Sequence, residues 1–142
     1  MQLRTEIEID AAPERVWSVL TDFPHYHAWN PFITSVEGDL AVGSTLVIRV
    51  SPPESSESKL RPKLLVCEAP RELRWRGHLF VKGLLDGEHF FQVEELPEGR
   101  TRFVHGEDFS GLLLRFVHRQ LTEVARGFVY MNQALKKRVE QV

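Results

Sequence analysis

Two ionisable side chains stand among aromatic residues in the segment 101–109, which reads TRFVHGEDF. A strict alternation along a β-strand places His105 and Glu107 on the same face. Phe103 and Phe109 flank them on that face, and the aromatic face of a half-buried antiparallel sheet points inward. Burying an imidazole and a carboxylate is costly unless the two groups are paired or reach water. The pair therefore either holds itself together in a dry core or lines a cavity.

Two further predicted strands supply inward-facing side chains. His89 and Phe91 share one face of the strand 88–96, and Trp75 lies on one face of the strand 72–79. An apolar wall that carries a few polar groups is typical of a small-molecule pocket. In the alternative interpretation, the polar side chains hydrogen-bond to one another or to the backbone and only complete the core.

The ionisable residues also match one kind of metal site by type. His89, His105 and Glu107 are two histidines and one carboxylate, the ligand set of a facial iron site. Their spacing carries no metal-binding signature, so we expect no metal and no cofactor. The sequence has no nucleophile motif, phosphate-binding loop or cofactor fingerprint. Its single cysteine, Cys67, excludes an internal disulfide and a multi-cysteine zinc site.

Composition limits the remaining classes. The 142 residues are typical of one domain, spanning 1–142, and the net charge of −2 comes from scattered charges. The absence of a basic block argues against nucleic acid as a partner. No run approaches 18 apolar residues, so we expect no integral membrane association. The N-terminal residues lack the apolar stretch of a signal peptide, which favours a cytoplasmic protein.

The elements that position these residues can be predicted from periodicity. Alternation predicts a strand over 3–10, and an apolar stripe after Pro13 predicts a helix, with a short second helix over 25–29. Six strands are predicted over 33–36, 44–51, 60–68, 72–79, 88–96 and 100–109. Helical spacing over 112–141 predicts one helix about 45 Å long. We expect an α+β helix-grip fold, with a curved seven-stranded antiparallel sheet wrapped around the C-terminal helix.

The predicted C-terminal helix carries an apolar stripe that should face the sheet. Phe116, Val124 and Phe128 belong to this stripe, and Gln120 is its polar exception, which we interpret as a ligand contact. Gly127 either permits a close approach to this helix or lies on its outer face.

The connection 79–85 is unusually apolar for a link between strands. If Phe80, Val81, Leu84 and Leu85 were exposed, they would mark a cavity portal, a homodimer contact or a weak membrane contact. If they fold inward, they belong to the core, and we favour this second interpretation.

Several short motifs connect the chain to a known family. They are APERVW at 12–17, WNPFI at 29–33, LRW at 73–75, DGEH at 86–89, TRF at 101–103 and MNQALK at 131–136. With the order of elements, they make residues 3–140 similar to the START-like superfamily, and within it to the bacterial polyketide cyclase/dehydrase and lipid-transport (SRPBCC) group. This resemblance implies a cavity beneath the long helix for sterols, lipids, plant hormones or polyketides. Only some members of the superfamily are enzymes.

We therefore expect the protein to bind an apolar or amphipathic small molecule, lipid-like or polyketide-like, beneath the C-terminal helix. The expected ligand-binding residues are Trp75, His89, Phe91, Phe103, His105, Glu107, Phe109, Gln120, Val124 and Phe128.

One alternative is an enzyme of the cyclase, aromatase or dehydratase type. In it, His105, positioned by Glu107, removes a proton beside a carbonyl, and Trp75 or His89 donates a hydrogen bond to the enolate. Nothing in the sequence requires this chemistry, so binding without turnover is favoured. A second alternative is a protein-interaction module that uses the apolar loop 80–85.

Overall fold

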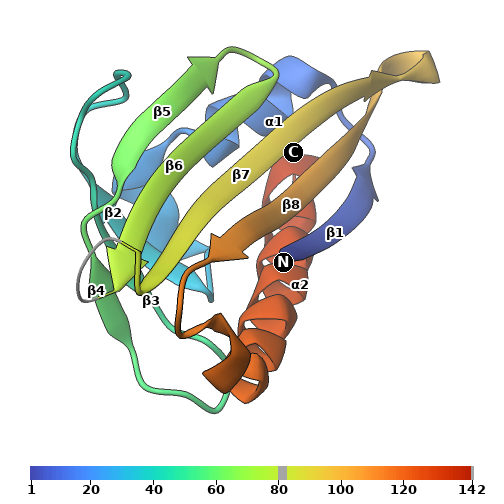
Figure 1. The fold of residues 1–142 in the computed structure, drawn as a ribbon. Coiled ribbons are helices and arrows are strands. Elements are labelled where there is room, and N and C mark those ends of the chain that lie inside the picture. The colour runs from blue at the N-terminus through green and yellow to red at the C-terminus, as the bar shows by residue number, and fades with distance from the viewer. Residues whose placement is uncertain (80–82, 142) are drawn as a thin grey trace.

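The computed structural model describes residues 1–79 and 83–141. The described chain has the order of elements shown in Figure 1. The strands are β1 (Gln2–Ile9), β2 (Ile33–Glu37), β3 (Val47–Val50), β4 (Ser58–Leu60), β5 (Lys63–Glu68), β6 (Glu72–Leu79), β7 (Leu85–Leu96) and β8 (Arg100–Ser110). The helices are α1 (Pro13–Leu20) and α2 (His118–Glu140), with 3₁₀ turns η1 (Phe23–Ala28), η2 (Pro97–Gly99) and η3 (Leu114–Phe116).

The strands form two antiparallel sheets instead of the single seven-stranded sheet that we expected. The larger sheet has the order β1-β8-β7-β6-β5, and the smaller has the order β2-β3-β4. The strand predicted over 60–68 divides at Pro62, which has no N–H to donate to a ladder. An isolated bridge between Thr45 and Lys63 links the two sheets beside this break. The α+β class, the antiparallel pairing and the C-terminal helix agree with the prediction.

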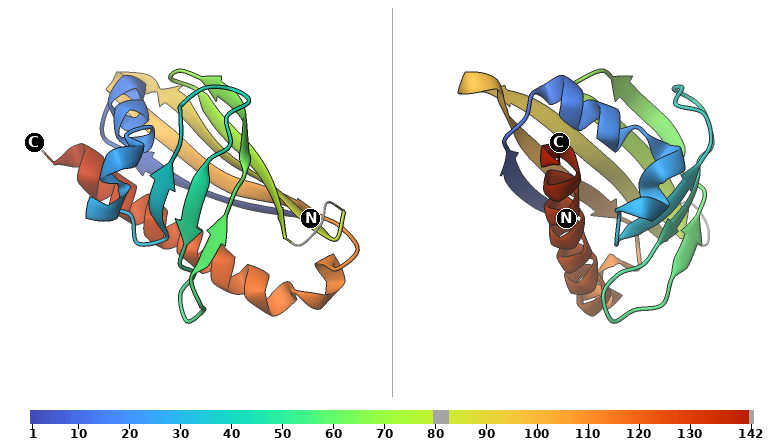
Figure 2. Two further views of the ribbon diagram at one scale, coloured as in Figure 1. Left: turned by 90° about the vertical axis from the view of Figure 1, so that its left-hand side faces the viewer. Right: turned by 180° about the vertical axis from the view of Figure 1, so that it is seen from behind.

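Helix α2 lies along the inner side of the larger sheet, and α1 and η1 cover one end of the space between them (Figure 2). Gly127 allows close packing at this layer. A Cβ atom at Gly127 would lie 2.2 Å from Cδ1 of Phe32, the residue just before β2. The glycine is buried, so the first of its two interpretations, close approach, is the one observed.

The long helix begins later than predicted. Residues 112–117 form a turn and η3, and α2 starts at His118. Gly111 has a φ of +120°, and the N–H groups of Leu112 and Leu113 donate to carbonyl groups of the segment just before β7. These bonds hold the segment away from the helical path. Phe116 is consequently 66% exposed, so the prediction that it faces the sheet is wrong.

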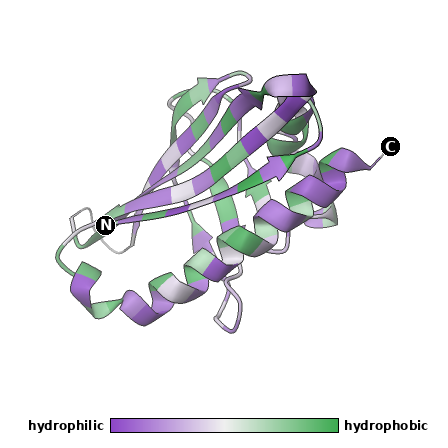
Figure 3. Cartoon of the chain, turned by 90° about the vertical axis from the view of Figure 1, so that its right-hand side faces the viewer, coloured by the Kyte–Doolittle hydropathy of each residue, from purple (hydrophilic) through white to green (hydrophobic). Residues whose placement is uncertain are grey.

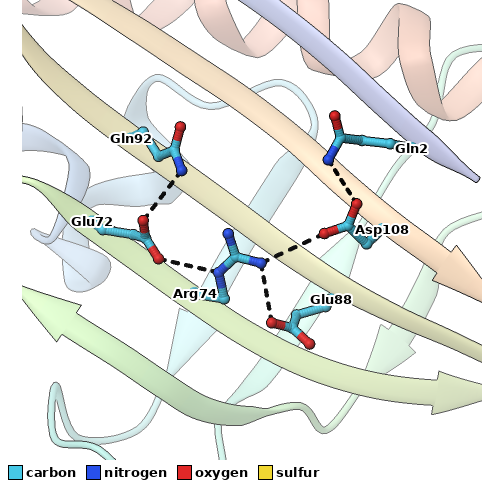
Figure 4. Close-up of polar contacts among 6 residues, drawn as sticks. All are labelled: Gln2, Glu72, Arg74, Glu88, Gln92 and Asp108. Carbon is cyan, nitrogen blue, oxygen red and sulfur yellow. Dashed lines mark hydrogen bonds and ion pairs between the residues drawn. The ribbon is translucent and has the colours of Figure 1, made fainter.

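Hydrophilic and hydrophobic residues alternate along the strands of the larger sheet (Figure 3), and the apolar positions are the buried ones. This alternation gives the sheet a polar outer face and an apolar inner face. On the outer face, Arg74 donates to Glu72 at 3.1 Å and to Glu88 at 3.0 Å (Figure 4). Asp108 lies 3.6 Å from the same guanidinium group, which also covers the ring of Phe90 at 4.8 Å. Charged side chains on this face are thus paired beside water, whereas those of the inner face need a different explanation.

The apolar connection between β6 and β7 is described only in part. Phe80 and Val81 lie outside the described residues, so the prediction for the loop 80–85 stays a prediction. Leu85, at the start of β7, is buried. Across residues 1–79 and 83–141, no helix combines the length and the apolar character needed to cross a membrane.

Candidate functional site

A cavity of about 440 Å³ lies between the two sheets and the first half of α2. Its size falls within the range of small-molecule sites. Most of its wall is apolar: Phe32, Ile33, Ile48, Val50, Leu60, Trp75, Leu85, Phe109, Leu113, Val117, Leu121 and Val124. His89 and Glu107 project from neighbouring strands onto one part of this wall. The arrangement can hold an apolar body and orient one polar group.

Six of the predicted ligand-binding residues line this cavity: Trp75, His89, Glu107, Phe109, Gln120 and Val124. The other four, Phe91, Phe103, His105 and Phe128, are fully buried in the core behind the wall. The expectation that these four face the cavity is therefore not met. Alternation along a strand predicts which face of the sheet a side chain lies on, but not whether that side chain meets the cavity or a helix. Here α2 packs directly on the strand positions among these four.

His105 shows this difference most clearly. Its ring stacks on Phe128 of α2, with the centroids 4.2 Å apart and an interplanar angle of 19°. Phe91 of β7 packs against it as well, with a centroid distance of 4.6 Å. The imidazole is enclosed by aromatic rings, so it has no direct access to a ligand in the cavity.

A continuous series of hydrogen bonds connects this buried imidazole to the cavity wall. Glu107 Oε1 lies 3.0 Å from His89 Nδ1, and His89 Nε2 lies 2.7 Å from His105 Nε2. On the other side, His105 Nδ1 lies 2.9 Å from Asn132 Oδ1, and the Asn132 amide donates to Thr5 Oγ1 at 2.8 Å. These five residues form the polar chain, and only Glu107 and His89 reach the cavity.

Strand register places the members of the polar chain beside one another. His89 on β7 pairs with Glu107 on β8, and Thr5 on β1 pairs with His105 on β8. Directly paired residues in antiparallel strands have neighbouring side chains. Gly87 makes room for the carboxylate, because a Cβ at this position would lie 2.1 Å from Glu107 Oε2. Pairing between the strands thus brings together residues that are distant in sequence, and alternation within each strand places their side chains on the same face.

The environment of His105 favours the neutral imidazole. Burial lowers the pKa of His105 well below its ordinary value, and the neighbouring His89 lowers it further. The hydrogen bond to Asn132 acts in the opposite direction and is the smaller effect. At neutral pH, His105 therefore carries a single ring proton.

Sequence reasoning missed Asn132 and Thr5, the two residues at the inner end of the polar chain. Asn132 is buried on α2, between Met131 and the next turn of the apolar stripe at Leu135. A polar residue inside such a stripe was a usable signal. Thr5 gave a weaker signal: it is a polar residue that shares the inner face of the first strand with apolar residues.

The three residues that resembled a facial iron set do not converge on one point. Both ring nitrogens of His89 are occupied, one by Glu107 and the other by His105, so the groups form a line. In the part of the chain that the structure describes, no three His, Cys, Asp or Glu side chains group as metal ligands.

The sequence matches a known family, and the fold matches known structures. The family described as "Polyketide cyclase / dehydrase and lipid transport" matches residues 1–140. No curated protein sequence matches the chain. The Zhui aromatase/cyclase from Streptomyces sp. R1128 has a similar structure, with a TM-score of 0.79 and 17% identity, covering 99% of this chain and 93% of that protein.

Two other solved structures widen this comparison. A START superfamily protein from Mycobacterium smegmatis has a TM-score of 0.74 and 20% identity, covering 99% of this chain and 97% of that one. A point mutant of norcoclaurine synthase from Thalictrum flavum, in complex with a transition-state analogue, has a TM-score of 0.75 and 14% identity. That match covers 98% of this chain and 93% of the synthase. At such identities, these structures establish a shared fold and no shared activity.

Proposed function

This chain belongs to the polyketide cyclase/dehydrase and lipid transport family, and from that membership we propose that it binds an apolar or amphipathic small molecule beneath α2. One observation carries the proposal: the mostly apolar cavity of about 440 Å³ has an ionisable pair, Glu107 and His89, on its wall. A lipid-like or polyketide-like ligand would place its apolar body against the aromatic and aliphatic wall. Its polar group would meet the pair.

Burial of apolar surface supplies the affinity in this proposal. Each methylene group removed from water contributes about 0.8 kcal/mol. A ligand with eight such groups would gain about 6 kcal/mol before the entropic cost of association. A hydrogen bond to the ionisable pair would then fix the orientation of the ligand more than its total affinity.

A pair of tryptophan substitutions on α2 tests the proposal. Val124 lines the cavity, whereas Val129 on the same helix is 41% exposed. Val124→Trp should fill part of the cavity and abolish binding of the apolar fluorescent probe N-phenyl-1-naphthylamine. Val129→Trp is the matched control and should bind as the unmodified protein does. Unchanged binding by Val124→Trp, in a variant that unfolds cooperatively, would contradict the proposal.

A second candidate function is an enzyme of the cyclase, aromatase or dehydratase type. The position of Glu107 favours it, because a carboxylate that faces an apolar cavity can act as a general base. His105 is too deeply buried for the base role predicted from the sequence, so Glu107 takes that role, with His89 as its partner. Incubation with poly-β-ketone thioesters would test this candidate. Cyclised product from the unmodified protein, and none from Glu107→Gln, is the expected result.

A further inference from the structure

The donors and acceptors of the polar chain can be assigned one by one, starting from Thr5. The Thr5 hydroxyl donates its single proton to the carbonyl oxygen of His105 at 2.9 Å, and a carbonyl oxygen can only accept. Thr5 Oγ1 must therefore act as an acceptor toward Asn132. The NH₂ group of Asn132 consequently faces Thr5, and its oxygen faces His105.

The same reasoning continues through the two imidazoles. The Asn132 oxygen can only accept, so His105 Nδ1 carries a proton. Because His105 is buried and neutral, its Nε2 carries a lone pair and no proton. His89 Nε2, 2.7 Å away, must then be the donor of the bond between the two rings.

One proton remains to be placed between His89 Nδ1 and Glu107 Oε1, which lie 3.0 Å apart. With the proton on His89, the pair is an imidazolium and a carboxylate. With the proton on Glu107, it is a neutral imidazole and a carboxylic acid. Without this proton, a lone pair of His89 Nδ1 would face a lone pair of Glu107 Oε1, and no hydrogen bond could form between them. The pair therefore holds one proton and has no net charge in either arrangement.

The second oxygen of Glu107 has the same role in both arrangements. The shared proton lies on the side of Oε1, so Oε2 carries none and can only accept a hydrogen bond. Among the described residues, no hydrogen bond reaches Oε2, which lies beside Gly87 on the cavity wall. From this acceptor we infer that the ligand is an uncharged molecule with a hydroxyl group, an alcohol or a phenol, which donates a hydrogen bond to Glu107 Oε2. The inference rests on the proposed binding function.

The charges around the cavity favour an uncharged ligand. The described lining contains two carboxylates, Glu107 and Asp86, and neither lysine nor arginine. Asp86 already accepts from a backbone N–H and lies 3.7 Å from Arg76. The ionisable lining residue His78 is exposed near the end of β6. A ligand carboxylate would add an uncompensated negative charge next to Oε2. An ammonium group would find no net negative charge on the pair, because the proton shared between His89 and Glu107 already neutralises the carboxylate.

Four octyl compounds that differ only at the polar end test this inference. They are 1-octanol, methyl octyl ether, octanoate and octylammonium, and the assay is displacement of N-phenyl-1-naphthylamine at pH 7.5. Octanol should displace the probe at a concentration about tenfold lower than the ether, which accepts but cannot donate. Octanoate should be at least about 100-fold weaker than octanol, because it would bury an unpaired charge.

The outcomes separate this inference from the proposed function. Equal displacement by octanol and the ether, or tightest binding by octanoate, would overturn the inference and leave the binding function standing. Tightest binding by octylammonium would show that Glu107 is not neutralised by the shared proton, and would also overturn it. Failure of the probe and of all four compounds to bind would overturn the binding function, and the inference with it.

Substitution of the acceptor provides the matched protein control. Glu107→Leu should reduce the preference for octanol over the ether to about one. Glu94→Leu, on the outer face of the same sheet, should keep the tenfold preference. Gly87→Ala is a second variant, and it keeps the Glu107 side chain. Its added Cβ would displace Glu107 Oε2, the end of a flexible side chain, and should also remove the preference for octanol over the ether. A preference that survives in both Glu107→Leu and Gly87→Ala would refute the assignment of Oε2.

Discussion

Replacing Gly127 with alanine should destabilise the protein, although the same change inside most helices is stabilising. Alanine has a helix propensity about 1 kcal/mol better than that of glycine. At this position, however, the added methyl group would lie 2.2 Å from Cδ1 and 2.4 Å from Cε1 of Phe32. Both distances are at least 1 Å shorter than ordinary van der Waals contact, which begins at 3.4 Å.

The size of the effect follows from the room available to Phe32. Overpacking of a well-packed core costs about 1–3 kcal/mol. The ring is buried, and it packs edge-on against Phe128 at a centroid distance of 5.5 Å, so relaxation on that side is restricted. We take a cost near the upper end, about 3 kcal/mol, and subtract about 1 kcal/mol of helix propensity. The free energy of unfolding should therefore fall by about 2 kcal/mol.

Urea unfolding followed by circular dichroism measures this change. A double-mutant cycle with Phe32→Ala isolates its cause, since Gly127→Ala should be nearly neutral or stabilising once the side chain beyond Cβ is gone. Phe32 also lines the cavity, so a shift of its ring would change the shape of the cavity wall. Weaker binding of the apolar probe should accompany the loss of stability. A more stable Gly127→Ala protein, or an equal loss in both backgrounds, would refute the reasoning.

The remaining predictions concern stability. Because burial lowers the pKa of His105 in the folded protein, the unfolded chain takes up this proton first as the pH falls. The stability from His105 is thus complete above about pH 6.5 and is lost below it, at up to about 1.4 kcal/mol per pH unit until the native pKa is reached. His105→Gln should show a smaller difference between urea unfolding at pH 7.5 and at pH 5.5, and equal differences would contradict the prediction. Tyr26→Phe should cost about 1–3 kcal/mol, because it leaves the Leu20 carbonyl oxygen buried without its donor. Thermal unfolding should show no comparable loss for Tyr130→Phe on the exposed side of α2, and equal losses would exclude this explanation.

Local sequence patterns predicted much of the fold because most elements obey local rules. The alternation around His105 and Glu107 predicted both the strand and the face of the sheet on which these side chains lie. The motifs predicted the family that matches the chain. Asn30 is another local feature, since its side-chain oxygen accepts from the N–H groups of Phe32 and Ile33 in the turn before β2. Each of these features depends on neighbours a few residues away.

The errors arose where the outcome depends on distant residues. Pro62 was visible in the sequence, but its effect is to end one ladder and start another in a different sheet. The depth of His105 is set by Phe128, a residue of the last helix. Asn132 was visible as a polar residue within an apolar stripe, yet its partner could be identified only once α2 had been placed on the sheet.

The pairing of β1 with β8 has a consequence for synthesis of the chain. β1 pairs only with β8 within the described sheet, and 100 positions separate Thr5 from the His105 carbonyl to which it donates. A ribosome must therefore complete β8 before β1 can gain a neighbour, and α2 emerges later still. Until then, nascent β1 carries unpaired backbone groups that attract other strands. Such long-range closure also slows folding, and the cavity cannot be completed until both β8 and α2 have been synthesised.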